Sequence, residues 1–208
     1  MIDVFTANIE QMDDYKYHYY LSMLPGNMKS AVVKYRLKED RYRTLAGKIL
    51  VQRYLEKNTE FSLTDIKTTR YNKPYLENSN IDFNISHSGE YVVSAFSNTT
   101  RLGIDIEKRN NGIDIEDFKS FLSSDEYKLL QNSKKKLKKF YTIWTVKEAL
   151  LKLLGTGLSD SAKEIVLLKG RVIFEDLQYH VSTFDLDHHT CSLVYEWCNS
   201  INIHNDQL

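Results

Sequence analysis

Two short segments of this chain carry charged side chains at spacings that could bind phosphate and a metal ion. The first is Gly-Ile-Asp-Ile-Glu at residues 103–107, which alternates as a β-strand does. Because residues two apart on a strand point to the same face, Asp105 and Glu107 share one face, and Ile104 and Ile106 share the other. The segment therefore predicts a pair of carboxylates opposite an apolar face.

The second segment, WTVKEALLKLL at residues 144–154, has the spacing of a helix. Five of its residues recur every three or four positions and so lie on one stripe: Trp144, Lys147, Glu148, Leu151 and Lys152. If that stripe faces the first segment, three carboxylates and two lysines converge. Such a cluster suits a hard divalent cation and a phosphate-rich ligand.

Length and composition predict a globular protein with a buried core. Of the 208 residues, 42% are hydrophobic and 12% are aromatic. The 28 basic and 28 acidic residues cancel, which argues against nucleic-acid binding by bulk charge. We find no signal peptide and no apolar run of membrane-spanning length. Cys191 and Cys198, the only cysteines, are expected to be free, so we expect a cytoplasmic protein with no nucleic-acid or membrane partner.

The chain also contains a faint internal duplication with an offset near 100 residues. Ile-Asp-Val at residues 2–4 corresponds to Ile-Asp-Ile at residues 104–106, and a helical pattern at residues 39–57 recurs at residues 140–154. Each helix is followed by a pair of strand-like runs around a turn. We therefore expect two α+β halves, an N-terminal one over residues 1–101 and a C-terminal one over residues 102–208.

Together with three further segments, the two charged segments resemble the 4'-phosphopantetheinyl transferases of the longer, surfactin (Sfp) type. The further segments are KEDRYRTLAG (38–47), NKPY (72–75) and FNISHSGEYVVSAF (83–96). The resemblance implies an α+β fold of two similar halves related by a pseudo-twofold, with the ligand cleft between them. It also implies a monomer, because the shorter members of the family build the same cleft between subunits. The last fifty residues carry no matching motif.

The resemblance implies a metal site and a catalytic lysine. Asp105, Glu107 and Glu148 match the family's ligands for Mg²⁺, with Mn²⁺ as the alternative ion. Without the resemblance, an exposed strand edge and a surface pair between Glu148 and Lys152 explain the same residues. Lys152 matches the lysine that contacts the diphosphate, and Glu148 is the candidate base, directly or through water. Lys147 could contact phosphate or form a salt bridge.

Glu126 matches a further acidic position near the metal and is a third catalytic candidate. Its alternative role is that of an acid at a helix start, following Ser123 or Ser124.

The resemblance also predicts residues that bind coenzyme A. Ser86 and His87 match contacts to its nucleotide end, with His87 facing the 3'-phosphate. Lys73 fits the adenine side, and Thr44 fits a phosphate contact. Three more basic residues are candidate partners of the 3'-phosphate: Lys29, Lys34 and Arg36.

Two other charged segments need an explanation. A second Gly-Ile-Asp-Ile-Glu, at residues 112–116, is followed by Asp117 and Phe118, which suits the first turn of a short helix rather than a metal site. The lysines at residues 134–139 are either a solvated loop or a docking surface for an acidic partner.

The predicted reaction transfers 4'-phosphopantetheine from coenzyme A to a serine of an apo acyl or peptidyl carrier protein, and it releases adenosine 3',5'-bisphosphate. Two alternatives remain at this point. One is a Mg²⁺-dependent phosphohydrolase or nucleotidyl transferase using the same carboxylates. The other is a non-catalytic module that binds carrier proteins.

Overall fold

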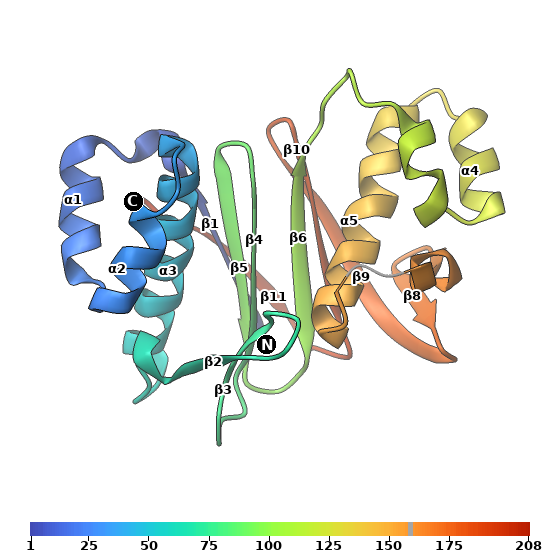
Figure 1. Ribbon diagram of the computed structural model, residues 1–208. Coiled ribbons are helices and arrows are strands. Elements are labelled where there is room, and N and C mark those ends of the chain that lie inside the picture. Colours follow the sequence, from blue (N-terminus) through green and yellow to red (C-terminus); the bar gives the residue numbers. More distant parts are fainter. Residues whose placement is uncertain (158–159) are drawn as a thin grey trace.

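The computed structural model describes residues 1–157 and 160–208, and it places two β-sheets between two groups of helices (Figure 1). The first part of the chain forms β1 (Ile2–Asn8), α1 (Asp14–Met23), α2 (Gly26–Val33), α3 (Lys38–Asn58), β2 (Ile66–Thr68), β3 (Pro74–Leu76), β4 (Asp82–Ser88) and β5 (Tyr91–Ser97). The second part forms β6 (Leu102–Lys108), α4 (Ser124–Gln131), α5 (Lys136–Leu154), β7 (Val166–Leu168), β8 (Arg171–Phe174), β9 (Leu177–Leu186), β10 (His189–Tyr195) and β11 (Ile201–Asn205). Short 3₁₀ helices are η1 (Ile9–Gln11), η2 (Leu63–Asp65), η3 (Ile115–Phe121) and η4 (Asp160–Glu164).

The first sheet has the strand order β11-β1-β5-β4, and β5 runs antiparallel to both of its neighbours. The apolar stripe of α3, which includes Leu45, Ile49 and Leu50, is buried in the core of this half. Gly47 faces the sheet, and a Cβ there would already touch Ile85 and Val92. The helical pattern of residues 39–57 thus forms the helix that covers the first sheet.

The second sheet has the order β6-β10-β9-β8-β7, and α5 packs on β6 and β10. Gly103 makes this contact unusually close, because a Cβ at this position would lie 2.0 Å from the carbonyl oxygen of Ala149 and 2.5 Å from the Leu153 nitrogen. Any other residue would push the helix off the strand. Residues 103–107, in β6, therefore pack directly against residues 144–154, in α5.

The order of elements repeats between the halves. In the first half, β1 pairs with β5 and β5 with β4, and α3 lies between β1 and β4 in sequence. In the second half, β6 pairs with β10 and β10 with β9, and α5 occupies the corresponding place. The expected fold of two similar α+β halves is confirmed.

The halves are joined by an apolar layer of buried side chains from strands of both sheets. It contains Ile2, Val4, Val93, Ala95, Leu102, Ile104, Ile106, Cys191 and Leu193. Residues such as Val92 and Phe96 alternate with Val93 and Ala95 along β5, so this strand is buried on both faces. The halves therefore form one packed unit.

The end of the chain modifies the expected division at residues 101 and 102. β11 pairs in parallel with β1, and the terminal Leu208 is buried in the core of the first half. The backbone oxygen of Leu208 also accepts a hydrogen bond from Lys16. The last strand therefore belongs to the first sheet, although it follows the second half in sequence.

The second copy of Gly-Ile-Asp-Ile-Glu begins η3. The Asp114 side chain accepts a hydrogen bond from the Glu116 backbone at the start of this helix. Its helix-start role is confirmed. Within the described residues, no helix is long and apolar enough to cross a membrane.

Candidate active site

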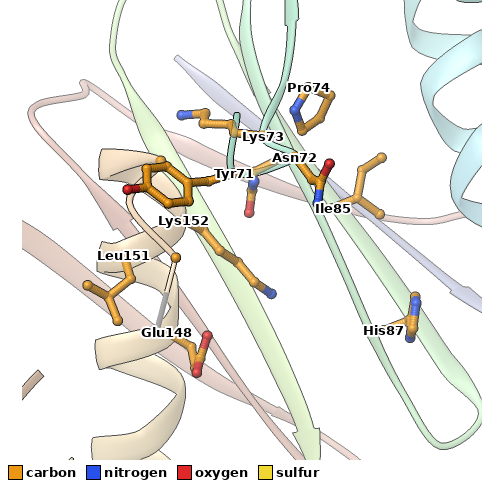
Figure 2. Close-up of a pocket in the computed structure, with 12 residues that line it drawn as sticks. Tyr71, Asn72, Lys73, Pro74, Ile85, His87, Glu148, Leu151 and Lys152 are labelled. Atoms are coloured by element: carbon orange, nitrogen blue, oxygen red, sulfur yellow. The ribbon is translucent and has the colours of Figure 1, made fainter. Parts of the chain in front are cut away.

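A cavity of about 390 Å³ lies between β4, the loop that joins β2 to β3, and the C-terminal half of α5 (Figure 2). Twelve residues line it: Tyr71, Asn72, Lys73, Pro74, Asn84, Ile85, His87, Glu148, Leu151, Lys152, Gly155 and Gly157. The cavity thus brings together segments from both halves of the molecule. It is the natural place to look for a ligand site.

Asp105 lies beneath this cavity, on β6, and is only 3% exposed. Its Oδ1 atom accepts hydrogen bonds from the Ser86 hydroxyl, at 2.8 Å, and from the Lys152 ammonium group, at 2.6 Å. Its Oδ2 atom is buried without a hydrogen-bond partner. A buried oxygen of this kind costs free energy unless a ligand completes its coordination.

Glu107 lies two residues further along β6, and its Oε2 atom accepts a hydrogen bond of 2.8 Å from the Ser88 hydroxyl. Burial raises the pKa of Glu107, and the neighbouring Asp105 adds to this effect. Asp105 and Glu107 thus share one face of the strand, as the alternation predicts.

Glu148 projects from α5, the helix that also carries Lys152 (Figure 2), and it is close enough to Asp105 and Glu107 to sense their charges. Burial, together with the charges of Asp105 and Glu107 and against the opposing charge of Lys152, raises the pKa of this carboxyl to about 7. The three carboxylates therefore repel one another, and the nearby ammonium group offsets only part of their charge.

The donor set fits a hard divalent cation, although it is not arranged as a finished metal site. Within residues 1–157 and 160–208, no three carboxylate, histidine or cysteine side chains already surround a common point. Burial, and then the neighbouring charges of Asp105 and Glu107, raises the pKa of Glu148, and the Oδ2 atom of Asp105 lacks a partner. A cation would stabilise the ionised carboxylates here. Carboxylate oxygens are the ligands that Mg²⁺ prefers.

Lys147 points away from this cluster and is 3% exposed. Its ammonium group donates to the carbonyl oxygens of Phe121, at 2.9 Å, and Ala162, at 2.7 Å, and to Glu126 Oε2 at 2.7 Å. It therefore joins α5 to η3, α4 and η4. Of the two roles open for Lys147, the salt bridge is the one observed.

The catalytic role expected for Glu126 finds no support in this geometry. Its Oε2 atom accepts hydrogen bonds from the Ser123 backbone and from Lys147, and Ser123 accepts one from the Glu126 backbone in return. This reciprocal pattern is a capping box at the start of α4. Glu126 occupies the helix-start position that was the alternative.

On the nucleotide side, His87 lines the cavity, and Lys73 lines it with its stem. Loss of hydration lowers the pKa of His87, and the positive charges of Arg43 and Lys152 lower it further. The ammonium group of Lys73 is engaged elsewhere, since it donates to Leu153 O at 3.0 Å and pairs with Asp82 at 3.1 Å. Figure 2 shows it directed away from His87.

The other expected contacts do not line this cavity. Thr44 lies on α3 and is partly buried, whereas Lys34 and Arg36 are exposed between α2 and α3. Lys29 lies within α2. Several lining residues were not expected from the sequence: Tyr71, Asn72, Asn84, Ile85, Gly155 and Gly157. The available signal was residue type: asparagine before Lys-Pro and the pair Gly155 and Gly157 favour turns, and all three residues have positive φ values here.

A cluster of carboxylates and a lysine, set beside a cavity at the junction of two α+β halves, defines a site suited to transfer of a phosphate group. The comparisons with known proteins agree. Residues 11–99 match the family described as 4'-phosphopantetheinyl transferase, N-terminal, and residues 101–199 match the 4'-phosphopantetheinyl transferase superfamily.

Characterised relatives cover most of the chain. The 4'-phosphopantetheinyl transferase Sfp of Bacillus subtilis is 32% identical over 180 residues, which is 81% of this chain and 80% of that protein. The 4'-phosphopantetheinyl transferase gsp of Aneurinibacillus migulanus is 33% identical over 163 residues, 76% of this chain and 68% of the relative. The chain belongs to the 4'-phosphopantetheinyl transferase superfamily, whose members transfer phosphopantetheine to carrier proteins.

Proposed function

We propose that this enzyme transfers 4'-phosphopantetheine from coenzyme A to a serine hydroxyl of an apo carrier protein, with Mg²⁺ bound by Asp105, Glu107 and Glu148. The observation that carries the proposal is the carboxylate cluster beside the cavity, of which Glu148 is a lining residue. Its buried Asp105 Oδ2 atom lacks a partner, and its Glu148 carboxyl has a pKa of about 7. Asp105, Glu107 and Glu148 would hold the cation, and its charge would offset the negative charge of these carboxylates and of the diphosphate.

In the reaction, the serine oxygen forms a bond to the phosphorus that carries pantetheine, and the bond from that phosphorus to the leaving phosphate oxygen breaks. Adenosine 3',5'-bisphosphate leaves with the electron pair, and the serine proton passes to Glu148 or to a water molecule beside it. A bound Mg²⁺ would supply charge neutralisation for the diphosphate. The chain's own residues hold the serine oxygen and the leaving phosphate oxygen in line on either side of the phosphorus.

We propose that Lys152 assists the leaving group. Its ammonium group lies 2.6 Å from Asp105 Oδ1 and 2.8 Å from the Ser86 oxygen, and its side chain lines the cavity. The side chain is 29% exposed, so it can exchange part of this contact for a phosphate oxygen. A fixed ammonium group stabilises negative charge that develops on the leaving phosphate.

For the nucleotide end, we propose that His87 contacts the 3'-phosphate and that Thr44 contributes a hydroxyl. Arg43, beside His87, donates to Gly89 O at 2.6 Å and pairs with Asp40, so it also holds this edge of the site together. Lys29, Lys34 and Arg36 remain candidate partners of the same phosphate. Lys73 contributes its stem, because its ammonium group is bound to the end of α5.

Both halves of the cavity come from one chain, so we propose that the enzyme acts as a monomer. Its two cysteines are free thiols, which fits a reducing, cytoplasmic compartment.

The direct test is a mass measurement. The protein is incubated with coenzyme A, Mg²⁺ and apo acyl or peptidyl carrier proteins, and the carrier is examined for added phosphopantetheine. Omission of Mg²⁺ with a chelator present is the matched control. If coenzyme A is consumed while the carrier mass stays constant, a phosphohydrolase or nucleotidyl transferase is favoured. If carrier binds and coenzyme A is not consumed, the non-catalytic module is favoured.

A further inference from the structure

We propose that Ser88 is a positioning residue for the transfer reaction, and that its hydroxyl fixes the Glu107 carboxylate for metal binding. This inference rests on the proposed function, since it assigns Glu107 to the metal. It concerns a side chain that the mechanism above does not use. Its basis is the contact between strands β4 and β6.

The hydroxyl of Ser88 makes two hydrogen bonds to β6. It accepts one of 3.0 Å from the Lys108 backbone N–H, and it donates one of 2.8 Å to Glu107 Oε2. A hydroxyl has a single proton to donate, so this proton is committed to the carboxylate. The backbone bond fixes the oxygen, and the fixed oxygen in turn orients Glu107.

The same pattern repeats along the whole seam between the two strands. Side-chain oxygens of alternate residues of β4 accept hydrogen bonds from alternate backbone N–H groups of β6, always at a separation of 20 residues. The pairs are Asp82 with Leu102, Asn84 with Ile104, Ser86 with Ile106, and Ser88 with Lys108. Side chains thus replace the usual backbone ladder and set the register of β4 against β6.

This register places both serines against the candidate metal ligands. Ser86 donates to Asp105 at 2.8 Å and accepts from Lys152 at 2.8 Å, in addition to its 3.4 Å contact with Ile106 N. Its hydroxyl proton is therefore committed as well, and a contact from Ser86 to the nucleotide would require these bonds to break. The two serines of Ser-His-Ser act toward the carboxylates, and His87 between them faces the opposite side of the strand.

Such supporting hydrogen bonds matter because a metal binds most tightly to carboxylates that are already oriented. Loss of a residue that orients a ligand typically weakens metal affinity about 10–100-fold. The Ser88 hydroxyl supplies the 2.8 Å hydrogen bond to Glu107 Oε2, and the Trp144 side chain is a second donor to this carboxylate. Removing the Ser88 hydroxyl therefore tests one of the two contacts that orient Glu107.

The test compares Ser88→Thr with Ser88→Val, which have the same shape and differ in the hydroxyl. Ser88→Ala is added because it only removes an atom and introduces no new contact. Mn²⁺ serves as a paramagnetic stand-in for Mg²⁺, and its affinity is measured by titration with detection of the free ion by electron paramagnetic resonance. Ser97→Ala is the matched control, since this buried serine donates to Met1 O, far from β6 carboxylates.

We expect Ser88→Val and Ser88→Ala to bind Mn²⁺ about tenfold more weakly than the wild type, and Ser88→Thr and Ser97→Ala to bind it normally. The Michaelis constant for coenzyme A at saturating Mg²⁺ should be unchanged in all of them. Equal Mn²⁺ affinities in the Thr and Val variants would overturn the inference. A wild type that modifies no carrier would instead contradict the proposed function, and these two failures are separate observations.

Discussion

The raised pKa of Glu148 makes a prediction about stability that needs no substrate. Burial and the charges of Asp105 and Glu107 raise this pKa from 4.5 to about 7. The folded protein therefore holds the proton more tightly than the unfolded chain does. The stability that this group contributes is fully present below about pH 4.5 and is lost as the pH rises through about 7.

The size of the loss follows from the two pKa values. Between about pH 5 and about pH 8, a shift from 4.5 to about 7 removes roughly 2.5 kcal/mol of unfolding free energy. Because the carboxyl group keeps some contact with water, we expect about 2 kcal/mol. Glu148→Gln carries no charge at either pH, so it should lack this part of the pH dependence. The variant should be inactive and yet more stable than the wild type at the higher pH.

The assay is urea unfolding of both proteins at each pH, with a chelator present. Glu56→Gln, an exposed glutamate of α3, is the matched control and should follow the wild type. Addition of Mg²⁺ at the higher pH should stabilise the wild type more than Glu148→Gln, because the cation relieves the repulsion among the carboxylates. Parallel pH profiles for wild type and Glu148→Gln would show that Glu148 ionises normally and would refute this account of the cluster.

Three further outcomes test other parts of the site. Asp105→Ala should abolish transfer in a carrier-modification assay, whereas Asp114→Ala, at the start of η3, should remain active. The reverse result would mean that the metal binds the second Gly-Ile-Asp-Ile-Glu segment, at residues 112–116. His87→Ala should weaken coenzyme A binding about tenfold or more and leave the binding of 3'-dephospho-coenzyme A nearly unaffected, since a charged hydrogen bond contributes roughly 1.5–3 kcal/mol. Calorimetric titration measures both affinities, and an equal loss for the two ligands would contradict a contact to the 3'-phosphate. Replacing Lys135 and Lys136 by Glu should raise the Michaelis constant for an acidic carrier, chiefly at low salt. Unchanged carrier kinetics would show that the lysines at residues 134–139 do not bind the carrier.

The choice of these two lysines comes from the structure. Lys138 forms an ion pair with Asp185, so reversing its charge would disturb the fold as well as the surface. Lys136 begins α5, whereas the helical pattern in the sequence was expected to begin at residue 140, after the lysine run. The first residues of α5 are nearly all lysines, so they show no alternation of apolar and polar residues that would indicate a helix. The expected start of the helix is therefore four residues too far along the chain.

The parts of the fold that depend on local patterns could be predicted. The alternation of residues 103–107 predicts β6, and the helical spacing of residues 144–154 predicts the C-terminal part of α5. The sequence could not decide between the two roles of Lys147, because a lysine on a helix looks the same whether it contacts phosphate or a buried partner. Its partners Phe121, Glu126 and Ala162 come from three other segments.

Contacts that depend on distant pairing were also beyond the sequence. The parallel pairing of β11 with β1 joins residues almost 200 positions apart, and no motif in the last fifty residues signals it. The role of Ser88 depends on the register of β4 against β6, which backbone strand pairing does not set in this case. Local periodicity reports which face a residue occupies and not which strand it meets there.

The seam between β4 and β6 also explains how the site can be ordered before any ligand binds. If the two halves rotated apart, the N–H groups of Leu102, Ile104 and Ile106, all in buried residues, would lose their side-chain acceptors together. Each unsatisfied buried group costs about 1–3 kcal/mol, so a hinge at this seam would be expensive. The distance from His87 to the carboxylates is therefore fixed by the fold. We therefore expect movement during the reaction to fall to long side chains. Lys152, whose side chain is 29% exposed, could move its ammonium group from Asp105 toward a bound phosphate without disturbing either sheet.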